Sequence, residues 1–288
     1  MATEVRALVL PGGGMKGAYQ VGALRHWMLE QGIDYPIMCG VSVGALNVAG
    51  LSAAPLGDPQ GAYQRLSSIW DRVENRTIRR DWPFFGKLAT LWKKSVYDAR
   101  PLMKWVHQEV HLEEIRNSGR EVRVGIVSWN SKAYRSVGQD DDGFADYVYA
   151  SASFPMFFQP LDRDGHLWTD GGLINVTPIK EAVRLGATHV DIIMNRNPAI
   201  SDPWEPKGKN ILDWVMRSIE IQQDEILRTD LEVVGLKNDL ADLGKNYRNV
   251  SFRLLEPQVT LSKDPLDFDP KKIAEIRQRG YDDARAMG

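Results

Sequence analysis

The sequence of 288 residues predicts an α/β fold, in which an open, largely parallel sheet carries helices on both faces. Short apolar runs typical of strands alternate with longer segments of helical periodicity along the chain. The first two turns from a predicted strand into a predicted helix are rich in glycine. No linker rich in Pro, Gly or Ser interrupts the chain, so residues 1–288 are expected to form one domain.

In the first half of the chain, apolar runs mark the strands and turn residues mark the ends of elements. Gly32 follows a helical pattern and is typical of a helix C-terminus. Asn-Ser-Lys at 130–132 separates two strand-like runs, which predicts a hairpin. The stretch 76–100 is irregular and rich in Trp and Phe. The expected elements are strands at 5–10, 35–39, 122–129 and 133–137, and helices at 17–31, 45–53, 59–74 and 101–110.

The second half continues the alternation of strands and helices. Asp-Arg-Asp-Gly at 162–165 predicts the turn of a second hairpin, and Pro178 occupies a favourable first-turn position of a helix. The core motifs fall within 5–195, and the largely helical part 205–288 is expected to pack on the same domain. The expected elements are strands at 157–161, 166–168, 189–194 and 250–255, and helices at 146–153, 178–185, 211–243 (one helix or a pair) and 270–287.

A serine between two glycines follows the second predicted strand. Gly-Val-Ser-Val-Gly at 40–44 lies where an apolar run meets a helical stretch, which is typical of a nucleophile elbow. Glycine on either side removes the Cβ atoms that would block so tight a turn. Ser42 is therefore the candidate nucleophile, and Gly40 and Gly44 support its turn.

A second glycine-rich turn follows the first predicted strand. Gly-Gly-Gly-Met-Lys-Gly at 12–17 opens a helix, where free backbone N–H groups and the helix dipole favour negative charge. Gly17 completes this motif, and Lys16 either adds positive potential or lies in solvent. The candidate oxyanion donors are the backbone N–H groups of Gly12, Gly13, Gly14 and Val43.

A carboxylate follows another short apolar stretch, in Trp-Thr-Asp-Gly-Gly at 168–172. Asp170 is the candidate base for Ser42, and Gly171 and Gly172 allow close backbone approach. An aspartate near its ordinary pKa of about 4 is a weak base toward a serine hydroxyl. Asp170 is an effective base only if a partly desolvated site favours the proton transfer.

Together the three motifs resemble the patatin-like phospholipase family, which carries a G-G-G-x-[KR]-G loop, a G-x-S-x-G elbow and a D-G-[GA] motif in that order. Ala-Ser-Ala-Ser-Phe-Pro at 150–155 resembles the A-S-x-S-x-P segment that often precedes the family's aspartate. The resemblance covers at least residues 5–195. One departure is Pro11, which stands where many members have Asp or Ser.

The resemblance implies a three-layer sandwich and a serine acyl hydrolase with a Ser42–Asp170 dyad that needs no histidine. Ser42 would attack the ester of a phospholipid or lysophospholipid, and Asp170 would accept its proton. Water would then hydrolyse the acyl-serine. The expected partner is a lipid or membrane-surface substrate, and neither a metal nor a cofactor is expected.

Two other classes of protein share parts of this pattern. Gly12, Gly14 and Gly17 also satisfy the dinucleotide fingerprint G-x-G-x-x-G, but the nearest acid, Asp34, precedes the second strand instead of following it. A Ser-His-Asp esterase of the α/β-hydrolase type requires a histidine after the acid. Only His189 follows Asp170, and it begins its strand at the edge opposite Ser42.

Aromatic and basic residues follow the elbow helix. The aromatic side chains either line an acyl pocket or contact lipid, or they pack in the core. The arginines either meet phosphate headgroups or form a solvated face. The aromatic residues are Trp70, Trp82, Phe84, Phe85, Trp92 and Trp105, and the arginines are Arg76, Arg79 and Arg80.

The composition is that of a globular protein with a formal net charge of −2, which gives no bulk attraction to nucleic acid. The single cysteine, Cys39, is expected to be buried and inert. Asp140-Asp141-Asp142 is expected to be a solvated loop instead of a metal site. No signal peptide or membrane span is predicted, so the expected location is the cytoplasm, with peripheral contact at membranes. Secretion without a cleaved signal is also compatible with the sequence.

Overall fold

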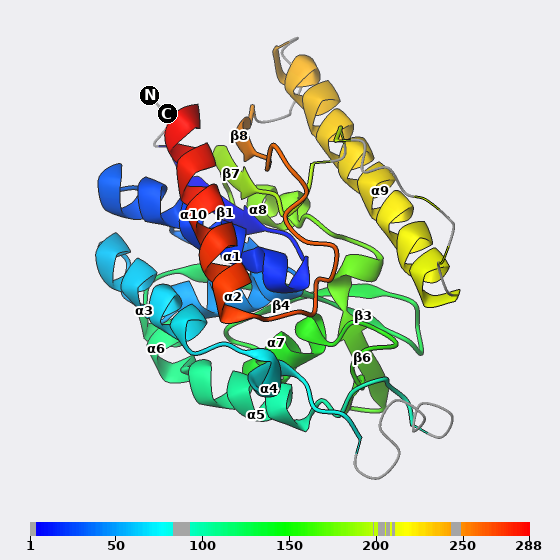
Figure 1. The fold of residues 1–288 in the computed structure, drawn as a ribbon. Coiled ribbons are helices and arrows are strands. Elements are labelled where there is room, and N and C mark those ends of the chain that lie inside the picture. Colours follow the sequence, from blue (N-terminus) through cyan, green and yellow to red (C-terminus); the bar gives the residue numbers. More distant parts are fainter. Residues whose placement is uncertain are drawn as a thin grey trace.

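The computed structural model describes residues 4–82, 93–197, 199–200, 205, 208, 211–242 and 249–288. Within these residues an eight-stranded sheet has the order β5-β6-β3-β2-β1-β7-β8, and β4 pairs with β3 in addition (Figure 1). The strands are β1 Arg6–Leu10, β2 Ile37–Gly40, β3 Glu121–Ser128, β4 Tyr134–Gly138, β5 Leu161–Arg163, β6 His166–Asp170, β7 His189–Ile193 and β8 Ser251–Leu255.

Helices cover both faces of this sheet, as the strand-helix alternation predicts (Figure 1). The α-helices are α1 Gly17–Leu24, α2 Val43–Ser52, α3 Pro59–Asp71, α4 Asn75–Ile78, α5 Arg100–Glu109, α6 Leu112–Asn117, α7 Phe144–Ala152, α8 Ile179–Arg184, α9 Ile211–Asp242 and α10 Pro270–Met287. The 3-10 helices are η1 Gly14–Lys16 and η4 Gly171–Leu173, and η2 Arg25–Glu30 extends α1 with π geometry.

Alternate residues of the central strand β1 enter two separate apolar cores. Leu8 and Leu10 pack with residues of α1, α2, α3, α7 and α10. Ala7 and Val9 point to the other face and pack with residues of α8 and α9. This period of two fits a strand that is buried on both sides, and the arrangement gives three layers.

The middle of the sheet is parallel, because β3, β2, β1, β7 and β8 all run in one direction. The turns that follow β1 and β2 therefore lie at the same edge of the sheet. These turns hold the glycine loop and Ser42, so both motifs lie at the carboxyl ends of their strands, where ligands bind in open α/β sheets.

Strand β3 brings a third segment to this edge. β4 pairs with residues 123–127 of β3, while β2 pairs with 121–124 and β6 with 126–128. Both β2 and β6 overlap the range of β4, so they share the opposite edge of β3. Gly40 lies opposite Val124 and Asp170 opposite Ile126, so the end of β2 faces the end of β6 across one residue of β3.

Some predicted boundaries were wrong. The strand predicted at 157–161 begins only at Leu161, because the chain at 154–158 turns instead and Phe158 N–H donates to the carbonyl of Phe154. Helix α6 was not predicted, and α4 lies inside the stretch expected to be irregular. The segment 211–242 is one continuous helix.

Helices α1 and α10 pack closely against each other at two glycines. A Cβ atom at Gly22 of α1 would lie 1.8 Å from the carbonyl oxygen of Arg277, and one at Gly280 of α10 would lie 2.0 Å from that of Tyr19. Backbone meets backbone at both points, so no side-chain movement can relieve the contact.

We expect Gly280→Ala to lower the free energy of unfolding by about 2 kcal/mol or more, because the added methyl group must push α10 away from α1. Gly235→Ala on α9 is the matched control. Nothing lies within 4 Å of its added Cβ, so it should stabilise the protein by about 0.5–1 kcal/mol. Urea unfolding of both variants measures the difference, and equal effects would contradict the close packing.

Candidate active site

Ser42 occupies a strained turn between β2 and α2. Its φ is 58° and its ψ is −128°, a backbone conformation that residues other than glycine rarely adopt. A Cβ atom at Gly44 would lie 1.9 Å from the carbonyl oxygen of Leu10, so only glycine permits this crossing of the two turns. The sequence pattern typical of a nucleophile elbow therefore has the geometry of one.

The Ala-Ser-Ala-Ser segment at the end of α7 holds Ser42 and Asp170 in place. The Ser42 N–H donates to Ser151 Oγ at 3.0 Å, and Ser151 Oγ donates to the carbonyl of Gly125 at 2.7 Å. The carbonyl of Ser153 accepts from Thr169 Oγ1 at 2.5 Å and from the Asp170 N–H at 3.4 Å. The sequence marked this segment only by its family resemblance, and the structure gives it a physical role.

Asp170 is buried, and its two carboxylate oxygens differ in their surroundings. Oδ1 accepts a hydrogen bond from the Gly172 N–H at 2.8 Å. Oδ2 is buried and accepts no hydrogen bond from the described residues. Burial raises the pKa of Asp170 to about 7, although the neighbouring Ser42 hydroxyl and the Gly172 N–H both act to lower it. The carboxylate is therefore adjacent to the serine, with Oδ2 available to receive a proton.

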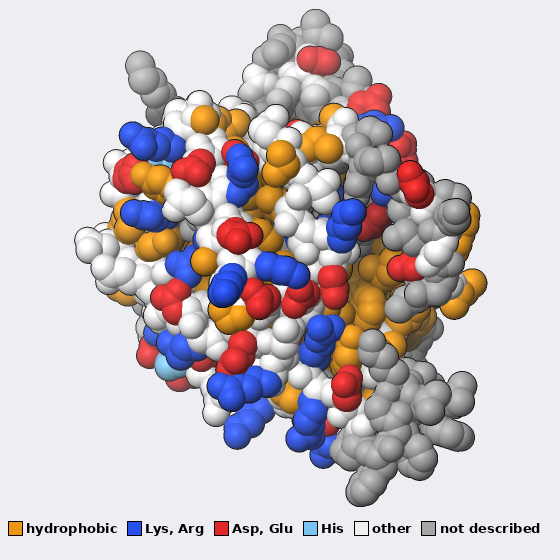
Figure 2. Space-filling view, in the orientation of Figure 1, with side chains coloured by type: hydrophobic (Ala, Val, Ile, Leu, Met, Phe, Trp, Pro, Cys, Tyr) orange, Lys and Arg blue, Asp and Glu red, His pale blue; other side chains and the backbone are white. Residues whose placement is uncertain are grey.

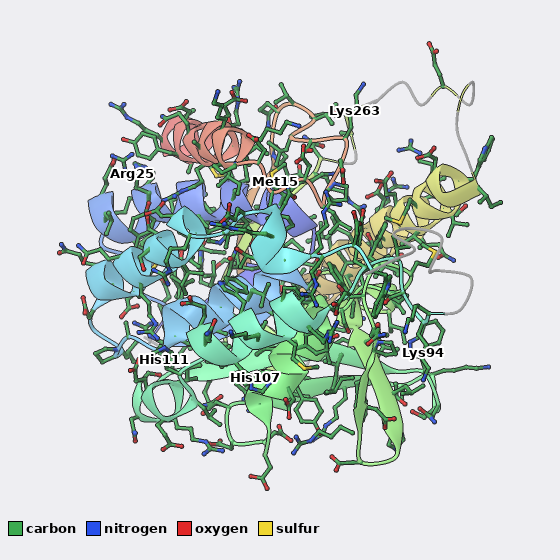
Figure 3. The ribbon with its side chains drawn as sticks, turned by 60° about the horizontal axis from the view of Figure 1, so that its bottom comes forward. Met15, Arg25, Lys94, His107, His111 and Lys263 are labelled. Carbon is green, nitrogen blue, oxygen red and sulfur yellow. The ribbon has the colours of Figure 1, made fainter. Side chains whose placement is uncertain are left out.

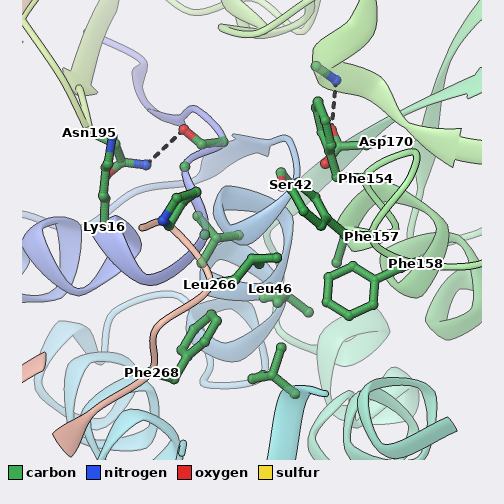
Figure 4. Close-up of a pocket in the computed structure, with 18 of the residues that line it drawn as sticks. Lys16, Ser42, Leu46, Phe154, Phe157, Phe158, Asp170, Asn195, Leu266 and Phe268 are labelled. Carbon is green, nitrogen blue, oxygen red and sulfur yellow. Dashed lines mark hydrogen bonds between the residues drawn. The ribbon is translucent and has the colours of Figure 1, made fainter. Parts of the chain in front are cut away.

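The glycine loop lies on the other side of Ser42, where a Cβ atom at Gly12 would come within 2.8 Å of the Ser42 Cβ. The N–H groups of Gly12 and Gly13 donate to no other described residue. The Asn195 side-chain amide, which no sequence motif marked, donates to the carbonyls of Pro11 and Gly12, both at 3.0 Å. Figure 4 shows Ser42 between Asn195 on one side and Asp170 on the other.

Buried amide side chains on α1 and α2 hold the glycine loop in place. Gln20 donates to the carbonyl of Pro11 at 2.9 Å and accepts from Asn47 at 2.7 Å. The indole of Trp70 donates to Asn47 Oδ1, also at 2.7 Å. Such a fully satisfied buried chain is rigid, because breaking any link leaves a polar group unpaired. Polar residues inside an apolar helical pattern were the available sequence signal for Gln20 and Asn47.

A largely apolar cavity of about 140 Å³ opens over Ser42 and Asp170. Phe154, Phe157 and Phe158 form one wall, and Leu46, Leu266 and Phe268 lie near the floor (Figure 4). Trp70, Trp105 and Lys16 also line it, as do Met216 and Ile219 of α9. Such a lining suits an aliphatic chain, with the polar groups concentrated at one end.

The remaining residues that the sequence singled out either lie outside the cavity lining or fall outside the described part of the chain. Trp82 donates to the carbonyl of Ser95, whereas Phe84, Phe85 and Trp92 lie outside the described residues. Cys39 is buried in β2, and burial raises the pKa of its thiol. Asp141 pairs with Arg135, and the described residues hold no cluster that could bind a metal ion. None of the described helices is both long and apolar enough to cross a bilayer.

The structure does not favour the alternative sites. His189 lies at the opposite edge of the sheet, where it contacts Asp191 at 3.0 Å and Ser251 at 2.7 Å. No histidine is among the described residues that line the cavity. Asp34 is occupied by Arg120 and the Gly57 N–H at the amino end of β2, so it is not placed to hold a ribose beside the glycine loop.

A model of the family described as patatin-like phospholipase matches residues 8–183. This range contains the glycine loop, the Ser42 turn and Asp170. The chain therefore belongs to the patatin-like phospholipase family.

Several proteins are similar to this chain over part of their length. Lysophospholipase NTE1 of Saccharomyces cerevisiae is 27% identical over 193 residues, which cover 63% of this chain and 10% of that protein. The patatin-like phospholipase domain-containing protein ZK370.4 of Caenorhabditis elegans is 29% identical over 189 residues, or 62% of this chain and 13% of that protein. YjjU of Escherichia coli is 26% identical over 193 residues, or 65% of this chain and 51% of that protein.

The chain thus spans about half of YjjU and a small part of the other two proteins. Among solved structures, VipD from Legionella pneumophila matches 99% of this chain and 67% of its own chain, with a TM-score of 0.47 and 14% identity.

The raised pKa of Asp170 predicts a pH-dependent cost to stability. Between about pH 4 and pH 7 the folded protein retains a proton that the unfolded chain has released, so stability falls as the pH rises through this window. Asp170→Asn removes the cost. The variant should gain about 2–3 kcal/mol more over the parent at pH 8 than at pH 5, measured by urea unfolding. A pH-independent difference would show that Asp170 has an ordinary pKa.

Proposed function

We propose that this protein is a serine acyl hydrolase that cleaves the ester bond of a phospholipid or lysophospholipid. The observation that carries the proposal is the strained Ser42 turn beside a buried carboxylate whose pKa is about 7, at the polar end of an apolar cavity. Family membership and the name lysophospholipase carried by NTE1 support a lipid ester as the substrate. Location in the cytoplasm with peripheral contact at membranes is part of the same proposal.

In the first half-reaction, Ser42 Oγ attacks the ester carbonyl and its proton passes to Asp170 Oδ2. The N–H groups of the glycine loop and of Val43 stabilise the oxyanion. When the tetrahedral intermediate collapses, the alcohol leaves with the proton from Asp170 and the acyl group stays on Ser42. Water then attacks the acyl-serine, Asp170 accepts and returns a proton as before, and the fatty acid is released.

Burial makes Asp170 a better base than a surface carboxylate. A carboxylate of ordinary pKa is too weakly basic to accept a serine proton readily, whereas one near 7 is matched to neutral pH. Oδ1 is oriented by the Gly172 N–H, which leaves Oδ2 as the basic atom. A positioned carboxylate of this kind supports a dyad without histidine.

A fluorophosphonate should form a covalent adduct on Ser42, because the reagent phosphorylates an activated serine beside an oxyanion site. Peptide mass spectrometry locates the adduct. Ser42→Ala should abolish labelling and lower hydrolysis of a short soluble ester by roughly ten-thousandfold. Ser131→Ala, on the exposed turn after β3, is the control and should be labelled like the parent. Labelling of a serine other than Ser42 would sink the proposal.

The value of kcat/KM for a short ester should rise with pH and level off above an apparent pKa near 7, because the ionised form of Asp170 is the base in the free enzyme. Histidine titrates in the same range, so histidine variants are the necessary control. Each should keep this limb of the profile, whereas Asp170→Asn should lose about a thousandfold or more in rate. If a histidine variant folds but its kcat/KM no longer rises with pH, the dyad is wrong and that histidine belongs to a catalytic triad. The variants change His26, His107, His111, His166 and His189 to Gln, one at a time.

A further inference from the structure

Basic side chains gather on the surface beside the cavity. In the described stretches 76–82 and 93–104 the acidic residues are Asp81 and Asp98 alone, against seven Lys and Arg. Six of the seven are exposed, and we call them the basic patch: Arg76, Arg80, Lys93, Lys94, Arg100 and Lys104. The patch lies over α4, α5 and the described residues between them, at the lower edge of Figure 2, where Lys and Arg side chains are concentrated.

Internal ion pairs cancel only part of this positive charge: Arg76 pairs with Glu74, but two other arginines of the patch share a single acid. Asp98 is buried and accepts hydrogen bonds from both Arg100 and Arg80. Arg100 and then Arg80 hold the pKa of its carboxyl well below the usual range. One buried carboxylate is thus shared by two arginines. The side chain of Arg100 remains 69% exposed and that of Arg80 54% exposed, so both have N–H groups facing solvent.

The patch is anchored to the cavity wall. The Val96 N–H donates to the carbonyl of Met156, and the Tyr97 N–H donates to that of Phe157, at 3.0 Å. Phe157 lines the cavity. Ile78, Leu102 and Trp105 also line it, and these residues alternate along α4 and α5 with members of the patch. The elements that carry the charge therefore also shape the pocket.

Exposed apolar side chains lie beside the same cavity. The first half of α9 contributes Met216 and Ile219 to the lining, while Ile211 is 81% exposed and Trp214 is 48% exposed. Figure 2 shows hydrophobic surface next to α9, adjoining the basic lower edge. Figure 3 turns the face of α4 and α5 forward, with Lys94 and His107 on it. Positive charge beside exposed apolar groups matches the headgroup and acyl layers of an anionic bilayer.

We propose that the basic patch docks this protein on an anionic lipid bilayer and thereby directs the cavity toward the membrane surface. The inference rests on the proposed lipid substrate for its purpose, but the docking step itself does not require hydrolysis. Phosphate and carboxylate headgroups are the acceptors that exposed guanidinium and ammonium groups bind. The protein as a whole has a formal net charge of −2, so the attraction must come from this local face.

The test compares two triple charge reversals that change the net charge equally. The patch variant carries Arg76→Glu, Lys94→Glu and Lys104→Glu, which leaves the pairs of Asp98 intact. The control variant carries Arg184→Glu, Arg279→Glu and Arg285→Glu on α8 and α10, away from α4 and α5 (Figure 1). Cosedimentation is measured with vesicles of phosphatidylcholine alone and of phosphatidylcholine with phosphatidylglycerol.

The parent should bind the vesicles that contain phosphatidylglycerol more tightly, and binding should weaken as salt rises from about 0.1 M to about 1 M. The patch variant should bind them roughly a hundredfold more weakly, because each basic residue near an anionic surface contributes about fivefold. The control variant should bind like the parent. Both variants should hydrolyse a soluble short ester at the parent's rate, since the changed residues do not line the cavity.

Equal loss in the two variants, undiminished binding by the patch variant, or no preference for anionic vesicles would each overturn the docking proposal. Ser42→Ala should dock like the parent. If the parent docks but hydrolyses no ester, the proposed function fails and the docking surface stands. If the parent hydrolyses soluble esters but ignores anionic vesicles, the docking proposal alone fails.

Discussion

The shared edge of β3 is the constraint on which the site depends. β2 pairs with one half of that edge and β6 with the other half, in opposite directions, so their ends face each other across Gly125. The register of two strand pairs therefore sets the separation of Ser42 and Asp170. A slip of one residue in either pair would turn a side chain to the other face. Gly125 leaves room here, because a Cβ atom on it would lie 2.8 Å from Val41.

Buried polar groups preserve this alignment from both sides. Ser151 links the elbow to the Gly125 carbonyl, and the Ser153 carbonyl links α7 to β6. On the far side, Asn195 draws the carbonyls of the glycine loop away from Ser42. These bonds orient dipoles before any substrate arrives, and such preorganisation is the main source of electrostatic stabilisation in enzymes. The same burial raises the pKa of Asp170, so positioning and basicity have one cause.

The sequence predicted what is encoded locally. The strand-turn-helix motifs placed Gly12 and Ser42 at one sheet edge, since glycine spacing and apolar runs are short-range signals. It did not reveal the shared edge of β3, because strand pairing between residues far apart leaves no local pattern. The strand predicted at 157–161 failed for a related reason. Apolar residues there line a cavity instead of a sheet, and composition alone does not separate the two. Asn195 was missed because a single amide in a loop carries no periodicity.

The glycine loop is closed by a residue that is synthesised much later. The Met15 N–H donates to the carbonyl of Pro265 at 2.7 Å, and α1 packs against α10 beyond it. A ribosome that adds about 5–20 residues per second therefore needs roughly ten to fifty seconds after making Met15 before this bond can form. Ser42 and Asp170 both precede Pro265 in the sequence, so they are made before the loop between β1 and α1 can gain this hydrogen bond. The hydrogen bond between Met15 and Pro265 therefore forms late, after the strands that carry Ser42 and Asp170 have been synthesised.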